Sequence, residues 1–213
     1  MRWKKISDAV VRRLPLYLRV LDDLVRNGEV KLISSQELGV KAGVGSALVR
    51  KDLAWFGEFG KQGMGYEVEF LHNELRRILN LNTVYRVALV GMGSLGVALA
   101  RYNLKRYQED NGYKMQIVAL FDNDISKIGT TFEGVDVFAI DKLEEITHDM
   151  SIEMAIITVP ANAAQIVAER LVAGGVKAIL NFAPIKLDLP EHIQVSSADL
   201  TLELQRLAYY LLE

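Results

Sequence analysis

The stretch VALVGMGSLGVALARY, residues 87–102, reads as an apolar strand, a glycine turn and a helix. Gly91, Gly93 and Gly96 fit the pattern G-x-G-x-x-G at the junction. In a dinucleotide-binding unit, such glycines allow a tight turn, close approach of the backbone to a pyrophosphate, and close packing of helix on strand. The helix N-terminus offers free N–H groups and a positive dipole end to the phosphates. The stretch therefore predicts the opening of a Rossmann-type unit.

A second expected strand, residues 116–122, ends in an acidic residue that completes this fingerprint. Asp122 follows Gly96 by 26 residues, and the polar segment 109–113 explains a gap somewhat longer than usual. A carboxylate at this place accepts hydrogen bonds from ribose hydroxyls and repels a 2′-phosphate, which favours NAD(H) over NADP(H). The alternative is a glycine turn in an α/β domain that binds another nucleotide, such as coenzyme A.

Strands rich in β-branched residues alternate with helical stretches through the rest of the second half. The expected strands are residues 85–91, 116–122, 135–140, 154–160, 177–184 and 193–197. The expected helices among them are residues 94–108, 141–147 and 162–173. Near-continuous apolar strands separated by helices indicate a parallel sheet covered on both faces.

The composition limits the class of protein. At 213 residues the chain is long for one domain, and the absence of cysteine excludes disulfides and cysteine–zinc sites. The histidines His72, His148 and His192 are scattered, so no metal site is expected. No apolar run reaches 18 uncharged residues and no signal-peptide pattern opens the chain, which predicts a soluble cytoplasmic protein that does not bind membranes.

The net charge of −2 conceals a difference between the two halves. Residues 1–66 contain 12 Lys and Arg against 7 Asp and Glu, whereas the remainder contains 13 against 20. This asymmetry suggests that a basic N-terminal module binds a polyanion.

Within the basic half, two short helices joined by a tight turn are expected. Ser34 and Glu37 form a capping-box signature for a helix that ends near Gly43. A second helix over residues 46–56 takes Ser46 as its N-cap. This order predicts a helix–turn–helix whose second helix enters the major groove of DNA.

The second of these helices has an inner face and an outer face. The residues expected to face the core are Leu48, Leu53 and Phe56. The residues expected to approach bases and phosphates are Ser46, Ala47, Arg50 and Lys51. On either side of the pair, residues 7–27 predict a helix interrupted at Pro15, and residues 67–79 predict a connector helix.

Residues 56–66, FGEFGKQGMGY, contain four glycines among aromatic residues. Closely spaced glycines favour tight turns, so a small hairpin is expected here. Beside a helix–turn–helix it would act as a wing, with Lys61 at its tip in the minor groove, where narrow A·T-rich sequence attracts cations. The alternative is an all-helical interaction module whose basic residues are merely solvated.

The chain ends with LTLELQRLAYYLLE, in which Leu200, Leu204, Leu207 and Leu211 form a helical stripe. Unless it packs on a partner, such a helix exposes a large apolar face. Only about 110 residues follow the fingerprint, which leaves little room for a catalytic domain. A small NAD-dependent oxidoreductase with a helical appendage is the alternative function, although no histidine is placed as a proton donor for one.

The motifs, taken in order, resemble those of the Rex family of redox-sensing transcriptional repressors. The resemblance runs through almost the whole chain: RLPLYLRVL, the segment SSQELGVKAGVGSALVRKDLAWFGEFGKQGMGY, the glycine fingerprint, FDNDISKIG, TVPA, NFAP and ADLTLELQRLAYYL. It implies an α/β protein with a winged helix-turn-helix DNA-binding domain and connector helix over residues 1–80. A Rossmann-type parallel-sheet NAD(H)-binding domain would cover 81–199. A C-terminal dimerisation helix over 200–213 would be exchanged between subunits.

The resemblance also implies a function. It is that of a homodimer, not an enzyme, which binds double-stranded operator DNA, expected to be an A·T-rich palindrome, and leaves it when NADH binds. The candidate cofactor-binding residues are Gly91, Met92, Gly93, Ser94, Leu95, Gly96, Asp122, Thr158, Val159, Pro160, Asn181, Phe182 and Ala183. The candidate DNA-binding residues are Ser46, Ala47, Arg50, Lys51 and Lys61. On the family pattern, Arg13 and Asp199 are candidates for an inter-domain ion pair, and a solvated pair is the equal alternative.

Overall fold

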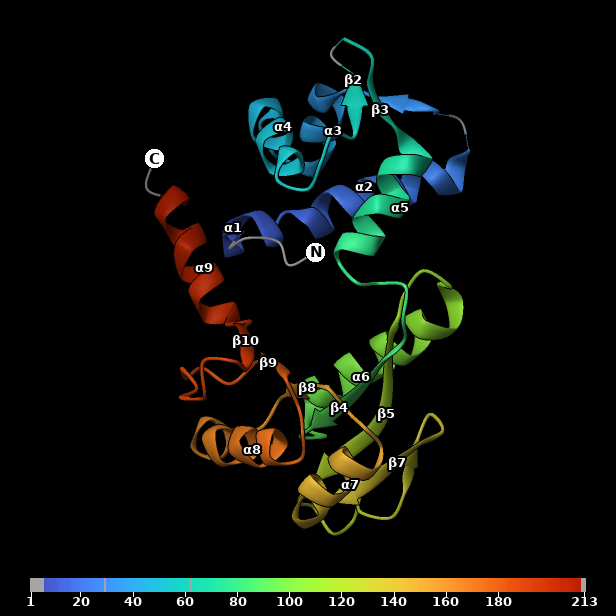
Figure 1. Cartoon of the computed structure of the whole chain (residues 1–213). Helices are drawn as coiled ribbons and strands as arrows, with labels where there is room; N and C mark the ends of the chain where they lie inside the picture. The colour runs from blue at the N-terminus through green and yellow to red at the C-terminus, as the bar shows by residue number, and fades with distance from the viewer. Residues whose placement is uncertain (1–5, 29, 62, 212–213) are drawn as a thin grey trace. The chain divides into compact units, whose positions relative to one another are not determined.

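The computed structural model describes residues 6–28, 30–61 and 63–211. The chain forms two compact units, Met1–Thr83 and Val84–Glu213, called here the N-terminal unit and the C-terminal unit (Figure 1). Each unit has its own hydrophobic core. No helix in the described ranges is both long enough and apolar enough to cross a membrane.

The N-terminal unit is a winged helix-turn-helix, as the sequence predicts. Its elements are α1 Asp8–Val11, α2 Leu14–Asn27, β1 Leu32–Ile33, α3 Ser35–Ala42, α4 Ser46–Ala54, β2 Gly60–Lys61, β3 Gly65–Glu67 and α5 Val68–Ile78. β2 and β3 form the expected hairpin, and β1, which was not expected, pairs antiparallel with β3 on its other edge. In Figure 1 the hairpin lies beside α3 and α4, while α2 and α5 pack together below them.

The first predicted helix is interrupted, but slightly before Pro15. The break between α1 and α2 falls at Arg12 and Arg13, and Pro15 lies in the first turn of α2. A first-turn residue has no carbonyl four residues back inside the helix to bond to, so proline starts this helix at no cost in hydrogen bonds.

Local chemistry explains the helix–turn–helix. The capping box is confirmed: the Glu37 backbone N–H donates to Ser34 Oγ at 3.1 Å, and the Ser34 N–H donates to Glu37 Oε2 at 2.9 Å. Gly43 ends α3 in the left-handed conformation with φ 69°. A Cβ on Gly39 would lie 2.4 Å from the Val44 carbonyl oxygen, so only glycine lets the turn fold back this closely.

Two details predicted for α4 are wrong. Gly45, not Ser46, is the N-cap, and Ser46 is the first helical residue. Leu48 is 37% exposed, and the fully buried Val49 takes the core position expected for it. Val49 lies four residues before Leu53 and shares its face of the helix, whereas Leu48 lies five residues before Leu53 and is turned away by about a further 100°.

The C-terminal unit is a mainly parallel sheet with the strand order β10-β9-β8-β4-β5-β7-β6. Its strands are β4 Tyr85–Val90, β5 Met115–Asp122, β6 Thr131–Phe132, β7 Val135–Ala139, β8 Met154–Ile157, β9 Ala178–Asn181 and β10 Gln194–Ser197. Its helices are α6 Ser94–Glu109, η1 Ile140–Lys142, α7 Leu143–Asp149, α8 Ala161–Ala173, α9 Leu200–Ala208 and η2 Tyr209–Leu211. The short β6, which is antiparallel to β7, was not expected.

The sheet is covered on both faces, as predicted. Along β4, Val87 and Leu89 pack in the same cluster as α6 residues, whereas Ala88 and Val90 pack with residues of α7 and α8. The strand order reverses on either side of β4. In open α/β sheets a crevice forms at the carboxyl ends of the strands at such a reversal, and ligands bind there.

The final helix is shorter than the predicted 200–213. α9 is followed by the 3-10 turn η2, and residues 212–213 lie outside the described ranges. Leu200, Leu204, Leu207 and Leu211 are 63%, 68%, 51% and 81% exposed. The C-terminal unit therefore leaves the apolar stripe on this segment unburied.

Candidate cofactor and nucleic-acid sites

The glycine fingerprint forms the turn from β4 to α6. Gly91 has φ 101°, and a Cβ there would lie 3.0 Å from the Thr158 backbone. A Cβ on Gly96 would lie 1.8 Å from the Gly91 carbonyl oxygen. Gly93 is different, because a Cβ there would meet nothing within 4 Å. The outer two glycines thus serve close packing, and the middle one leaves open space in front of the turn.

A cavity of about 700 Å³ opens at the carboxyl ends of β4, β5, β8 and β9. The predicted residues that line it are Gly91, Gly93, Leu95, Asp122, Thr158, Val159, Pro160, Phe182 and Ala183. Segments more than 90 residues apart in sequence therefore meet at one edge of the sheet. The Thr158 hydroxyl donates to the Gly91 carbonyl oxygen at 2.7 Å, which ties the end of β8 to the glycine turn.

Four predicted residues do not line the cavity. Ser94 is exposed in the first turn of α6, while Met92 and Gly96 are buried behind the turn. Asn181 is fully buried: its amide nitrogen donates to the carbonyls of Ala183 and Ile185, and its oxygen accepts from the Ala183 N–H. Its amide shapes the loop after β9, and its part in cofactor binding stays a prediction.

Asp122 is held at the centre of this site. Its Oδ2 accepts from the Met92 N–H at 2.7 Å and from Lys127 Nζ at 3.1 Å. Its Oδ1 accepts from the Asp124 N–H at 2.8 Å. Burial alone would raise the pKa of Asp122, but these hydrogen bonds outweigh burial and hold the pKa below its ordinary value. The carboxylate is therefore ionised and directly joined to the glycine turn.

Several lining residues were missed from the sequence. They are Val90, Asn123, Lys127, Ile140, Ala163, Ile166, Val167, Arg170 and Pro184. Those from α8 recur at helical spacing within a helix that was predicted, so their common face could have been recognised. Lys127 lies five residues after Asp122 in the motif FDNDISKIG, but its reach to the glycine turn is a tertiary contact.

These residues fit a dinucleotide. The N-terminus of a 16-residue helix, with its free N–H groups, faces the cavity beside the open Gly93. A carboxylate stands at the end of the second strand, where a ribose hydroxyl is bound in Rossmann sites. Ile140, Ile166 and Val159 add apolar wall on which flat rings can pack.

The N-terminal unit presents a basic face on α4. Ala47, Arg50 and Lys51 are exposed, and Ser46 is half-buried at the helix start. The Arg50 guanidinium donates to Ser35 Oγ at 2.8 Å, which holds it over the start of α3. Lys61 ends β2, but its side chain lies outside the described part of the structure.

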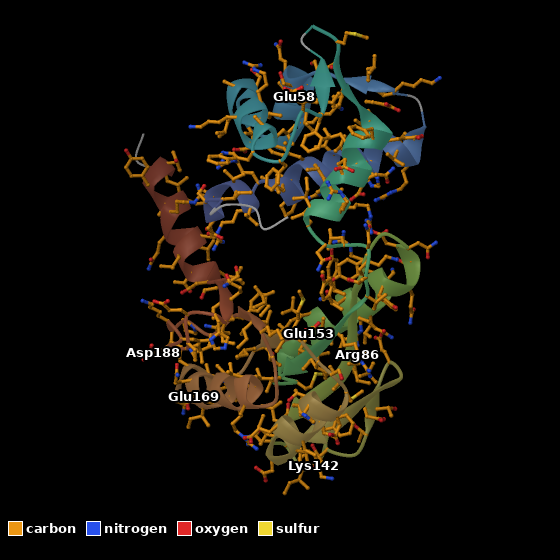
Figure 2. The ribbon with its side chains drawn as sticks, in the orientation of Figure 1. Glu58, Arg86, Lys142, Glu153, Glu169 and Asp188 are labelled. Atoms are coloured by element: carbon orange, nitrogen blue, oxygen red, sulfur yellow. The ribbon has the colours of Figure 1, made fainter. Side chains whose placement is uncertain are left out.

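A cleft of about 700 Å³ separates α4 from the wing. Arg50, Tyr66 and Glu58 are among the residues that line it, and Glu58 is labelled in Figure 2 on the turn that leads from α4 to β2. The cleft places one acidic and one basic side chain between the second helix and the hairpin.

The position of α4 depends on a buried ion pair that was not predicted. Asp52 is fully buried, and its carboxylate accepts from the Arg13 guanidinium at 2.6 and 2.7 Å and from the Tyr17 hydroxyl at 2.7 Å. Burial raises the pKa of Asp52, but the hydrogen bonds from Arg13 and Tyr17 more than offset this and leave the pKa lowered. The inner face of α4 is thereby fixed to α2.

The proposed inter-domain pair of Arg13 with Asp199 stays a prediction. Arg13 is engaged by Asp52 within the N-terminal unit. Asp199 caps α9, where its carboxylate accepts from the Thr201 N–H at 2.8 Å. Each side chain thus has a partner within its own unit.

Known proteins match both units. Residues 5–54 match a family described as "Putative DNA-binding protein N-terminus", and residues 82–185 match "CoA binding domain". Two proteins named redox-sensing transcriptional repressor Rex are similar, at 48% identity over 208 residues in Brevibacillus brevis and 46% over 209 residues in Carboxydothermus hydrogenoformans. Each match covers 98% of this chain and 98% of the relative.

Solved structures agree over the same length. "Crystal structure of RSP in complex with beta-NAD+ and operator DNA" has a TM-score of 0.88 at 37% identity, and covers 98% of this chain and 93% of that one. "Crystal structure of RSP in complex with beta-NADH" has a TM-score of 0.84 at 36% identity, with 98% and 95% covered. A third structure of the same protein is described as a Rex-family repressor. This chain belongs to the Rex family of redox-sensing transcriptional repressors.

Proposed function

We propose that this chain is a transcriptional repressor that binds operator DNA and leaves it when NADH occupies the C-terminal unit. The observation that carries the proposal is the pairing of two sites in one chain: a winged helix with an exposed basic helix, and a dinucleotide-type cavity. The cavity-lining residues Gly91, Gly93 and Asp122 would hold the adenosine and pyrophosphate, because they form the fingerprint that those groups require.

The response must come from the nicotinamide end of the ligand. NAD⁺ and NADH differ by a hydride and by the charge of one ring, and a ligand shifts an equilibrium only through its different affinity for the two states. A change in occupancy from 99:1 to 1:99 needs a difference in affinity of about 10⁴-fold, summed over all sites. Two cavities in a dimer would share this requirement.

The dimer itself is part of the proposal. The exposed leucines of α9 and η2 form an apolar surface that a second copy of the chain would cover, including by exchange of the helix. Two copies present two α4 helices, and a palindromic operator offers two half-sites in successive major grooves. A small rotation between the copies would then break the match to DNA.

We propose that the cavity binds a ligand without catalysing a reaction. Its charged side chains include Asp122, Lys127 and Arg170, and each is engaged by a neighbour: Asp122 with Lys127, and Arg170 with Glu144 at 2.9 Å. Of the three histidines, His148 and His192 are exposed and His72 belongs to the N-terminal unit, 2.9 Å from Asp22. The described wall of the cavity therefore offers no histidine to transfer a proton to a substrate.

Replacing Arg50 with alanine should lower operator affinity by about 10- to 100-fold, the effect of losing one well-placed arginine contact. NADH affinity should stay within about twofold of the native value, because Arg50 lies in the other unit. Operator affinity is measured by fluorescence anisotropy of labelled operator, and NADH affinity is measured separately by NADH fluorescence.

Arg77→Ala is the matched control for Arg50→Ala. Arg77 is an exposed arginine in the last turn of α5, paired with Glu74. In Figure 1, α5 runs away from the wing toward its last turn. The loss of Arg77 removes the same charge and should leave operator affinity nearly unchanged. Equal losses in the two variants would mean that net charge, and not the α4 face, accounts for DNA binding.

A further inference from the structure

The wall of the dinucleotide cavity carries a cation beside its acidic residue. Lys127 Nζ lies 3.1 Å from Asp122 Oδ2 and 3.0 Å from the Met92 carbonyl oxygen. The Lys127 side chain is 38% exposed and lines the cavity, whereas that of Asp122 is 7% exposed. The carboxylate and the glycine turn therefore hold an accessible ammonium group next to the place that the fingerprint assigns to the ribose.

This pairing matters for the choice between two dinucleotides. NADP(H) differs from NAD(H) by a phosphate on the 2′-hydroxyl, and sites that accept it provide a basic side chain near the end of the second strand. A lysine ammonium is a compact charge with three donors and binds phosphate well. In this chain Asp122, which would repel a 2′-phosphate, lies beside Lys127, a cation that could bind one.

We propose that Lys127 is a latent ligand for a 2′-phosphate and that Asp122 keeps it from acting as one. This inference rests on the proposed function, because it assumes that the cavity takes a nicotinamide dinucleotide. In the native chain the 2′-phosphate of NADP(H) would be repelled by the Asp122 carboxylate, and the Lys127 ammonium is already bound to that carboxylate. Without the carboxylate, a donor is already present on the wall.

The charge of Lys127 does not depend on Asp122. The hydrogen bond to Asp122 raises the pKa of Lys127, and an ordinary lysine without that bond is still protonated at neutral pH. Asp124 is the other acid near the ammonium, with Oδ2 at 3.6 Å. It is half-exposed, and its Oδ1 already accepts from the N–H and the hydroxyl of Ser126, so it competes weakly with a phosphate.

The test is a titration of the full chain with NADH and with NADPH, followed by nicotinamide fluorescence. The native chain should prefer NADH strongly. Asp122→Ser, which removes the charge and makes room, should raise NADPH affinity by about 10- to 100-fold, the range of one charge-assisted hydrogen bond. The double variant Asp122→Ser with Lys127→Met should lose this gain.

The double variant shows whether Lys127 binds the 2′-phosphate. If it binds NADPH as well as Asp122→Ser does, relief of repulsion is the whole effect and Lys127 is not a ligand. If Asp122→Ser lowers the melting temperature too far, Asp122→Asn replaces it in the comparison with and without Lys127→Met. The asparagine keeps an acceptor for the Met92 N–H. If the native chain does not bind NADH, the proposed function is wrong. If the native chain binds NADH but neither Asp122 variant gains affinity for NADPH, only this inference is wrong.

Discussion

Gly96→Ala should lower NADH affinity by at least about 100-fold and destabilise the C-terminal unit. The new Cβ would lie 1.8 Å from the Gly91 carbonyl oxygen, a backbone atom that cannot move unless the turn from β4 to α6 opens. Overpacking of this kind costs about 1–3 kcal/mol or more. Opening the turn also removes backbone donors from a pyrophosphate, each worth about 1.5–3 kcal/mol, and every 1.4 kcal/mol changes affinity about tenfold.

Gly93→Ala separates binding from folding in the same six-residue motif. Gly93 has φ −76° and ψ −172°, which alanine adopts readily, and its Cβ would meet nothing within 4 Å. Melting without ligand should therefore change little, while NADH binding should weaken because the methyl group occupies space in front of the turn. Calorimetric melting and NADH titration of both variants check this. Equal losses of melting temperature in the two variants would contradict the roles assigned to these glycines.

Asp52→Ala should destabilise the N-terminal unit by about 3 kcal/mol, the lower end for breaking a buried ion pair by removing one partner. The Arg13 guanidinium and the Tyr17 hydroxyl would both lose their acceptor. The side chain of Arg13 is 22% exposed, so water recovers part of the loss. The sequence contains no tryptophan after Trp55, so the C-terminal unit contributes no tryptophan signal, and tryptophan fluorescence during urea unfolding follows the N-terminal unit.

The matched control is Asp8→Ala, which breaks the exposed pair of Asp8 with Arg12 and should lower the free energy of unfolding by less than half as much as Asp52→Ala does.

The two variants should also differ in how their stability depends on pH. The pKa of Asp52 is lowered in the folded state, so its stabilisation is complete above the unfolded value near pH 4 and is lost as pH falls through the folded value. Asp52→Ala should lack this acid-dependent loss. A similar midpoint shift in both variants would contradict a special role for the buried pair.

Features that depend on neighbouring residues could be predicted from the sequence. The capping box at Ser34, the glycine turn after β4 and the hairpin follow from local backbone chemistry, and all are present. Two errors of one residue arose in α4. Gly45 and Ser46 both suit an N-cap, and Leu48 and Val49 are adjacent apolar residues of which only Val49 is buried.

Roles that depend on distant contacts could not be predicted in this way. Asp52 meets Arg13 across 39 residues, and Lys127 meets the Met92 carbonyl across 35. Periodicity describes one element at a time, so it does not show which charged side chain will be buried against another. The intra-loop hydrogen bonds of the Asn181 amide were not foreseen either, and its part in cofactor binding stays a prediction.

The most direct test of the account is release of operator by cofactor, measured by fluorescence anisotropy on a labelled A·T-rich palindrome. With DNA and protein concentrations fixed, NADH should lower the bound fraction steeply, while NAD⁺ and coenzyme A at the same concentrations should leave most DNA bound. The three ligands share an adenine nucleotide end, so only the reduced nicotinamide ring can account for a response to NADH alone. Equal release by NADH and NAD⁺, or release by coenzyme A only, would contradict the proposal that this chain senses NADH.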